Sequence, residues 1–311
     1  MTLQTNYRPF DVDTDFVIPA EWRKGVAIED NPYPSLLVDI TSRCNMRCNF
    51  CYYRERNIPD MSVAFFTRLC ENLPEPIIMK LAGGEPTLHP HLDEFVRIAV
   101  ANRHRIYVCS NGLRYSDPQF LESMHKVGRD GNTFCLGMSM DGGTSNGRAY
   151  ETINGRDCTR EKNEAFKALV ASRVARVCLT AIIVRGWNES VIPELLNLAD
   201  EHSDEVRYIH LRNAGRVGEF ADTEPYTLEE LKGLMGEHFT DDQMRPQCVG
   251  EIHCPAHASR NCCFRFRPTR RLQISLVEFA SERAANCPKR GRMILESDKI
   301  YPLFHSIREE M

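Results

Sequence analysis

Short apolar runs alternate with longer amphipathic ones through the first two thirds of the chain, and this alternation restricts the possible folds most strongly. The longer runs place apolar residues three or four positions apart, as Leu92, Phe95 and Val96 do, which predicts helices. Strands that alternate with helices predict an α/β protein with a parallel sheet, either an open doubly wound sheet or a partial barrel. The predicted strands are 36–41, 77–82, 105–110, 133–140, 176–184 and 206–211, and the predicted helices are 62–72, 91–102, 118–127, 160–172 and 191–202.

The alternation stops after residue 211, where the composition also changes. The residues that follow are rich in cysteine, arginine and proline, and two alternating runs around Pro268 predict a β-hairpin. The chain therefore divides into three parts. We expect an N-terminal extension at 1–34, a β/α domain at 35–212 and a C-terminal extension at 213–311, with a loop at 213–224 and helices at 228–238 and 299–310.

Thirteen of the 311 residues are cysteines, in a composition that is otherwise typical of globular proteins. No basic segment followed by an apolar stretch opens the chain, and apolar runs such as 177–184 are far shorter than a membrane-spanning helix. We therefore expect a cytoplasmic protein without membrane contact, in which thiols stay reduced. An odd number of cysteines in that compartment argues against disulfide bonds and favours metal sites, reactive thiols or buried apolar side chains.

Five cysteines are scattered singly through the predicted β/α domain. Cys109, Cys135 and Cys178 lie in apolar strand-like runs and Cys70 fits a helix, so these four are expected to pack as small apolar side chains. Cys158 is expected at the surface or half-buried. None of the five is therefore expected to bind a metal.

Cys44, Cys48 and Cys51 form the pattern C-x3-C-x2-C directly after the first predicted strand. Three thiolates on so short a loop can converge on one metal ion or cluster. A structural zinc site normally takes four protein ligands, whereas a [4Fe–4S] cluster held by three cysteines leaves one iron free to bind a substrate or cofactor. The spacing therefore favours a cluster, with zinc or a chance pattern as the alternatives.

Three further segments of small or polar residues follow predicted strands. Gly83-Gly84-Glu85-Pro86 follows the second strand, Ser-Asn-Gly at 110–112 follows the third, and Ser-Met-Asp-Gly at 139–142 follows the fourth. The carboxyl ends of parallel strands meet at one rim of the sheet, where ligands bind. We therefore expect these segments to surround the loop that carries the three cysteines.

The three-cysteine loop, with Phe50 before its last cysteine and Gly83-Gly84-Glu85-Pro86 after the next strand, resembles the signature of the radical S-adenosylmethionine (radical SAM) superfamily. The resemblance covers residues 35–212. It implies a partial (β/α)6 TIM-like barrel, followed here by a small cysteine-rich C-terminal extension. It also implies an enzyme in which a [4Fe–4S] cluster reductively cleaves S-adenosylmethionine to a 5′-deoxyadenosyl radical, which abstracts hydrogen from a substrate.

The resemblance further implies roles for individual residues, with Cys44, Cys48 and Cys51 as the cluster ligands. Gly83 and Gly84 lack a Cβ atom and would let the backbone approach the ligand closely. The residues expected to contact S-adenosylmethionine are Phe50 near the adenine, Glu85 on the methionyl ammonium, Asn111, Ser139 and Asp141 at strand ends, and Arg212, with Arg216, on a carboxylate or phosphate. For Asn111, Ser139 and Asp141 the alternative is local capping of turns, and for Glu85 it is a solvated carboxylate.

Five cysteines gather in the C-terminal extension, around the predicted hairpin. Their order resembles the SPASM and twitch extensions of radical SAM enzymes, which hold auxiliary [4Fe–4S] clusters. The usual spacing is absent, however, so a zinc site that includes His253 or His257 and a set of free thiols remain alternatives. The five are Cys248, Cys254, Cys262, Cys263 and Cys287.

The charge is unevenly distributed, with nine Arg and Lys against two Asp and Glu at 253–292, although the whole chain carries −4. Such a segment is compatible with an anionic partner, and its interleaved phenylalanines would suit nucleic acid. The alternative is a solvated hairpin face that packs on an acidic barrel. The SPASM resemblance favours modification of a peptide or protein side chain. Radical modification of a nucleobase or nucleic acid is one alternative, and a small metabolite as substrate is another. A reductant such as flavodoxin or ferredoxin would be a further partner. The alternative without catalysis is a zinc-stabilised binding module on a degenerate barrel.

Overall fold

One sheet with parallel central strands organises the chain in the computed structural model, which describes residues 26–31, 35–51, 59–74, 76–127, 134–214, 223–246, 263–278, 290–293 and 299–302. The strand order is β1-β11-β10-β2-β3-β4-β5-β6-β7-β9-β8. The six strands predicted from the sequence form its consecutive centre. They are β2 (Ser35–Thr41), β3 (Ile78–Gly83), β4 (Arg105–Val108), β5 (Phe134–Ser139), β6 (Arg176–Ile183) and β7 (Val206–Asn213).

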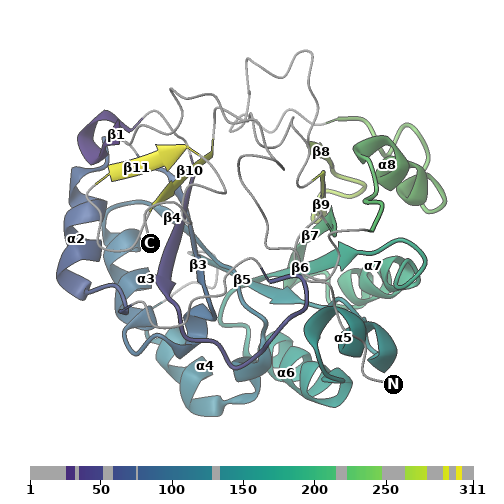
Figure 1. Cartoon of the computed structure of the whole chain (residues 1–311), viewed down its shortest axis with the longest axis horizontal. Coiled ribbons are helices and arrows are strands. Elements are labelled where there is room, and N and C mark those ends of the chain that lie inside the picture. Colours follow the sequence, from purple (N-terminus) through teal and green to yellow (C-terminus); the bar gives the residue numbers. More distant parts are fainter. Residues whose placement is uncertain are drawn as a thin grey trace.

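The central strands curl into an arc, and the helices cover its convex side (Figure 1). This arrangement is a partial TIM-like barrel, as the sequence predicts. The five helices predicted between the strands are present to within two residues at each end. The helices are α2 (Val63–Asn72), α3 (Leu92–Ala101), α4 (Pro118–His125), α5 (Gly147–Asn154), α6 (Thr159–Ser172), α7 (Val191–Glu201) and α8 (Leu228–Gly236).

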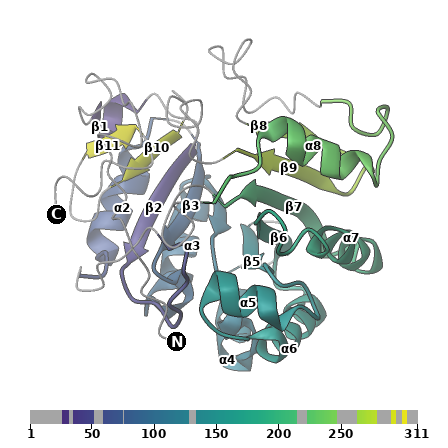
Figure 2. The ribbon, with the colours of Figure 1, turned by 45° about the vertical axis from the view of Figure 1, so that its right-hand side comes forward.

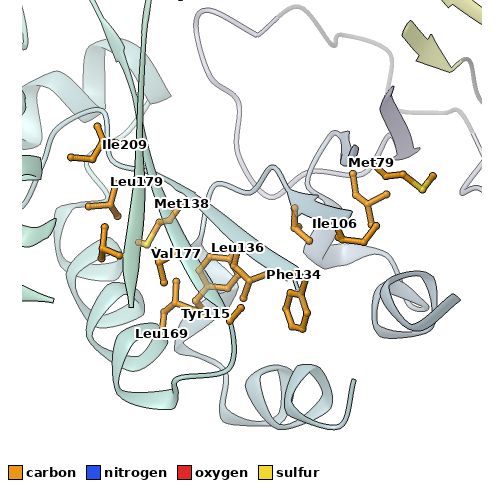
Figure 3. Packing of buried hydrophobic residues seen from close by; sticks show 14 of the residues in the cluster. Met79, Ile106, Tyr115, Phe134, Leu136, Met138, Leu169, Val177, Leu179 and Ile209 are labelled. Carbon is orange, nitrogen blue, oxygen red and sulfur yellow. The ribbon is translucent and has the colours of Figure 1, made fainter. Parts of the chain in front are cut away.

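Alternate residues of each central strand form the hydrophobic layer between the sheet and its helices. In β2, Leu36, Val38 and Ile40 are fully buried, because successive side chains of a strand point to opposite faces. The same alternation continues across the sheet and meets apolar residues such as Leu169 of α6 (Figure 3). Burial of this kind stabilises a fold by about 25 cal/mol per Å² of apolar surface, so this layer is its main source of stability.

The opposite, concave face of the sheet carries polar and charged side chains. Lys80, Tyr107, Cys135 and Arg176 are neighbours in register across β3 to β6 and therefore share this face. Arg212 of β7 lies beside Ile182 on the same rim. The apolar layer thus fixes the sheet from outside and leaves the concave side to chemistry.

Three further cysteines that were expected to pack as small apolar side chains lie on the concave side of the sheet, where Cys178 is buried and Cys109 and Cys135 are half-buried. Cys109, Cys135 and Cys178 surround the Tyr107 hydroxyl, and burial raises the pKa of the Cys109 and Cys178 thiols to about 12. They are therefore protonated thiols. Cys70 is packed in the outer core as predicted.

The C-terminal residues complete both edges of the sheet. The predicted hairpin is present as β8 (Cys263–Phe266) and β9 (Gln273–Val277), and β9 pairs in parallel with β7. At the other edge β10 (Arg290–Met293) pairs in parallel with β2. Figure 2 shows these two groups of strands at opposite ends of the arc.

The prediction of a terminal helix at 299–310 is wrong for its first turn. Lys299–Pro302 is strand β11, which pairs with β10 and with β1 (Val26–Ala27). As a strand this segment pairs with β10 and β1 on its two sides, and it thereby covers an edge of β10 that a helix would have left unpaired. No helix in the part of the chain that the structure describes is long and apolar enough to cross a membrane.

Sequence periodicity missed the helix α5, which begins after Asn146 and ends at Gly155. Asn146 caps its first turn by accepting a hydrogen bond from the Ala149 N–H, at 2.9 Å. Gly155 ends it in the left-handed conformation, with φ of 82°. Both signals are visible in the sequence, but a helix of eight residues gives little periodicity.

We predict that the stability of the protein falls at acid pH because His89, in the turn after β3, must stay neutral. Its Nε2 donates to the Met61 carbonyl at 3.0 Å and its Nδ1 accepts from the His91 N–H at 3.1 Å. Burial is the main cause that lowers the pKa of His89 below its ordinary value of 6.5. The neutral form is therefore favoured in the folded state, so this contribution is complete above about pH 6.5 and is lost as the pH falls through the lower folded pKa.

Denaturant unfolding of the wild type and of His89→Gln between about pH 7 and pH 5 measures this effect. The wild type is expected to lose more stability on acidification than the variant, which cannot titrate. His125→Gln, at an exposed position, should keep the wild-type slope. Parallel slopes for the wild type and His89→Gln would contradict the prediction.

Candidate functional site

The three cysteines lie on a loop at the carboxyl end of β2, half-buried against other segments of the rim. Cys44 and Cys48 pack with Met46, Tyr150 and Cys158. Two N–H groups already point at their sulfur atoms. Met46 N donates to Cys44 Sγ at 3.4 Å, and Asn154 Nδ2 donates to Cys48 Sγ at 3.6 Å.

The glycines after β3 bring this strand end against the backbone that enters the cysteine loop. Gly84 N donates to the Thr41 carbonyl at 2.8 Å, and Glu85 N donates to the Arg43 carbonyl at 2.7 Å. A Cβ atom on Gly83 would overlap the Thr41 carbonyl oxygen, and one on Gly84 would overlap that of Arg43. What the glycines approach in this chain is thus the backbone immediately before Cys44, and they fix the loop against the neighbouring strand.

The carboxylate of Glu85 is buried, with 1% of the residue exposed, and joins the ends of β3 and β4. Its Oε1 accepts from the Thr87 N–H at 3.1 Å, the Thr87 hydroxyl at 2.6 Å and the Ser110 hydroxyl at 2.7 Å. Its Oε2 accepts from the Asn111 N–H at 2.7 Å. The alternative of a solvated carboxylate is therefore wrong, because these four donors replace water around the charge.

A fully buried lysine, which sequence analysis did not single out, joins the ends of β4 and β5. Lys162 of α6 donates to the Asn111 carbonyl, to the Ser139 carbonyl at 2.6 Å and to the Ser139 hydroxyl at 2.9 Å. Burial lowers the pKa of its ammonium group. The three acceptors use all three ammonium protons, so Asn111 and Ser139 are held in fixed positions on the rim.

Asn111 and Asp141 each bridge two segments of the rim. The Asn111 amide donates to the Asn45 side chain, inside the cysteine loop, at 2.8 Å. Asp141 is buried, and its carboxylate accepts from the Ile182 N–H at 2.8 Å and from the Asn154 amide at 3.0 Å. Both residues therefore do more than cap local turns, which was the alternative expected from the sequence.

Phe50 and Arg212 meet across the rim. The Arg212 guanidinium lies 5.7 Å from the centre of the Phe50 ring, which also packs against Ile153 and Val184. A cation over an aromatic face gains stabilisation from the ring quadrupole. The structure thus places the two residues expected to contact the adenine and an anionic group side by side, where the cysteine loop meets β7.

The donor set of the loop fits an iron–sulfur cluster in its chemistry. Burial raises the pKa of the Cys48 thiol to about 12, so a thiolate there needs a cation, which cluster iron would supply. The N–H groups on the Cys44 and Cys48 sulfur atoms match the hydrogen bonds that tune such clusters. In the described residues no three Cys, His, Asp or Glu side chains are grouped closely enough to hold a metal ion.

Two other expected features of the site have a different outcome. Cys158 was expected at the surface or half-buried, but it is fully buried beside Cys44 and Cys48, where the start of α6 packs on the loop. The cysteines of the C-terminal extension lie outside the described residues, except for Cys263, of which the backbone is described in β8. Arg216 also lies outside them.

Comparison with known proteins agrees with this geometry. Residues 38–199 match the family model of the radical SAM superfamily. The "GTP 3′,8-cyclase" of Chlorobaculum tepidum is 30% identical over 247 residues, which are 73% of this chain and 72% of that protein. The protein of the same name from Stenotrophomonas maltophilia is 27% identical, over 59% of this chain and 56% of its own length.

Among solved structures, Streptococcus suis SuiB bound to the precursor peptide SuiA superposes with a TM-score of 0.54 at 16% identity. The alignment covers 68% of this chain and 46% of SuiB, so the chain spans about half of that protein. At this identity the likeness concerns the fold alone. The family model, which matches more than half of the chain, and the cyclase relatives establish an enzyme that uses a [4Fe–4S] cluster and S-adenosylmethionine: the chain belongs to the radical SAM superfamily.

Proposed function

We propose that Cys44, Cys48 and Cys51 hold the [4Fe–4S] cluster and that the enzyme acts on an anionic substrate of the purine nucleotide class. When bound, the cluster supplies the electron that cleaves S-adenosylmethionine. The chain's own contribution is to orient the cofactor at the rim. The ends of β3, β4 and β5 are tied together there by Glu85 and Lys162.

The observation that carries the substrate proposal is the charge of the concave face. Among the strand residues that the structure describes, Asp39 is the only acidic one, and it is 2% exposed. Lys80, Arg176 and Arg212 lie on the concave side of β3, β6 and β7. Lys80 and Arg212 both lie close enough to the Cys109 thiol, inside the arc, to lower its pKa, against the larger effect of burial and the opposing charges of Asp39 and Glu85. A concave surface that carries cations attracts phosphate groups.

The expectation of a peptide or protein substrate loses its support. The relative from Chlorobaculum tepidum, which aligns with 73% of this chain, is named for a reaction of GTP, whereas the peptide-binding SuiB is similar in fold alone. The described part of the basic hairpin also has partners in its own chain, since Arg271 pairs with Asp204 and Arg267 donates to Gln273. The basic hairpin is therefore a weaker argument for nucleic acid than the concave face is for a nucleotide.

The C-terminal cysteines enter the proposal as candidates for an auxiliary cluster. Four of the five lie outside the described residues, and Cys263 is the first residue of β8, at one edge of the sheet. Iron analysis distinguishes the cases, since the first cluster alone gives about four iron atoms per chain and an auxiliary cluster about eight.

The experiment is S-adenosylmethionine cleavage by anaerobically reconstituted protein, with dithionite as reductant and with or without GTP. We expect 5′-deoxyadenosine to form and GTP to bind and to raise its rate, whereas an unrelated peptide should not. Lys80→Met should weaken GTP binding, and Lys126→Met, at an exposed position on the outer side, should not. Cleavage that GTP leaves unchanged, with no measurable GTP binding, would overturn the substrate proposal and leave the enzyme class intact.

A further inference from the structure

Asn154, the last residue of α5, is buried beside the cysteine loop, but only part of its side-chain amide is hydrogen-bonded. It is 3% exposed, and its Nδ2 donates to the Cys48 sulfur at 3.6 Å and to Asp141 Oδ2 at 3.0 Å. Its Oδ1 is buried and receives no hydrogen bond. Buried carbonyl oxygens without a donor are rare in folded proteins, because they lose their hydrogen bonds to water, and a bound ligand is one partner that would complete this one.

The place of the amide makes the missing donor specific. The Asn154 side chain lies between Cys48, a proposed cluster ligand, and Asp141, at the end of β5. The expected S-adenosylmethionine site is on this rim, and that molecule offers an ammonium group, two ribose hydroxyls and an adenine amino group as donors. The Asn154 carbonyl is thus a free acceptor at the edge of the site.

We propose that Asn154 has two roles in the active site, one through each end of its amide. The N–H end donates to the Cys48 thiolate and thereby stabilises the reduced cluster, which carries more negative charge. The C=O end accepts a hydrogen bond from bound S-adenosylmethionine. One side chain therefore couples the reduction potential of the cluster to occupancy of the cofactor site.

A neighbouring asparagine shows why the open acceptor is unusual. Asn188 is also buried near Asp141, yet its Oδ1 accepts from the Val184 N–H at 2.8 Å and its Nδ2 donates to the Asp141 and Ile182 carbonyls. Its amide is fully used by the fold. Asn154 uses only the donor half, so the structure alone does not account for its carbonyl.

The test compares reconstituted wild-type protein with Asn154→Leu, which keeps the volume, and Asn154→Ala, which favours the helix. The reduction potential of the cluster is measured by redox titration followed by electron paramagnetic resonance. The dissociation constant of S-adenosylmethionine is measured separately by calorimetry. Both variants should show a more negative potential and a dissociation constant raised about three- to tenfold, as expected for one lost hydrogen bond.

Asn163→Leu is the matched control, because the Asn163 amide binds only the Thr144 carbonyl, at 2.8 Å, among the contacts of the described chain. It should leave both quantities unchanged, and thermal unfolding without cofactors should show that all the variants fold. An unchanged potential would overturn the role of the N–H end, and an unchanged dissociation constant that of the C=O end. This inference rests on the proposed cluster site. A wild-type protein that takes up no cluster would overturn both the cluster site and the role of Asn154. A wild type that holds the cluster, with Asn154 variants of the same reduction potential and the same dissociation constant, would overturn the role of Asn154 alone.

Discussion

A variant in which Cys44, Cys48 and Cys51 are all alanine is expected to lose about four iron atoms per chain and to form no 5′-deoxyadenosine. The three side chains are only half-buried, so their removal takes little apolar surface from the core. The backbone of the loop is held independently, by the Gly84 and Glu85 N–H groups on the Thr41 and Arg43 carbonyls. The variant should therefore stay folded, with a change in the free energy of unfolding of about 1 kcal/mol or less.

Iron and sulfide analysis, together with chromatography of the reaction under dithionite, measures this loss. Cys70→Ala is the control, because Cys70 is packed in the outer core between α2 and the sheet. It should keep the iron and the product, at some cost in stability. Product formation by the triple variant would contradict the assignment of the cluster, whereas remaining iron without product would locate a second cluster on the C-terminal cysteines.

The central fold could be predicted because two independent sequence signals agree. A short, mostly apolar run, such as the one at 36–40, marks each strand, and the helical periodicity marks the longer segments between them. Together they specify parallel strands, since consecutive strands joined by a helix pair in that orientation. The same two signals predict that the three cysteines and Glu85 lie on one rim, because both segments follow strands of a parallel sheet.

The ends of the sheet could not be predicted, because their strands are short and pair with distant residues. β10 and β11 have four residues each and lie beside β2 and β1, more than 250 positions earlier in the chain. A strand of that length gives almost no periodic signal. Its pairing partner decides its conformation, and one sequence does not show which partner is available.

Sequence patterns also do not predict the polar contacts of the rim. Lys162 and Asn154 lie in amphipathic helices, where a polar residue normally faces solvent. They are buried because the ends of α5 and α6 pack directly against the rim, which depends on tertiary structure alone. The only hint at Lys162 was its place among the apolar positions of α6, between Cys158 and Phe166.

Glu85→Ala is expected to have the largest effect on stability of any single change at the rim. It would leave four donors without their acceptor, on Thr87, Ser110 and Asn111. Hydrogen bonds to a charged group contribute about 1.5–3 kcal/mol each, and buried donors left unpaired add to the loss, so we expect destabilisation of at least about 3 kcal/mol. Affinity for S-adenosylmethionine should fall as well, because the ends of β3 and β4 lose their common anchor.

Denaturant unfolding and calorimetric binding, with Glu151→Ala as a control at an exposed position of α5, separate two roles for this carboxylate. If Glu85 anchors the strand ends, its variants should lose stability and cofactor affinity together. Glu85→Gln, which keeps one oxygen acceptor, should then lie between the wild type and Glu85→Ala in both quantities. If Glu85 instead binds the methionyl ammonium directly, Glu85→Gln should lose affinity for S-adenosylmethionine while its free energy of unfolding stays unchanged. The four donors around the buried carboxylate favour the first result, because they leave an incoming ammonium group little of the carboxylate to bind.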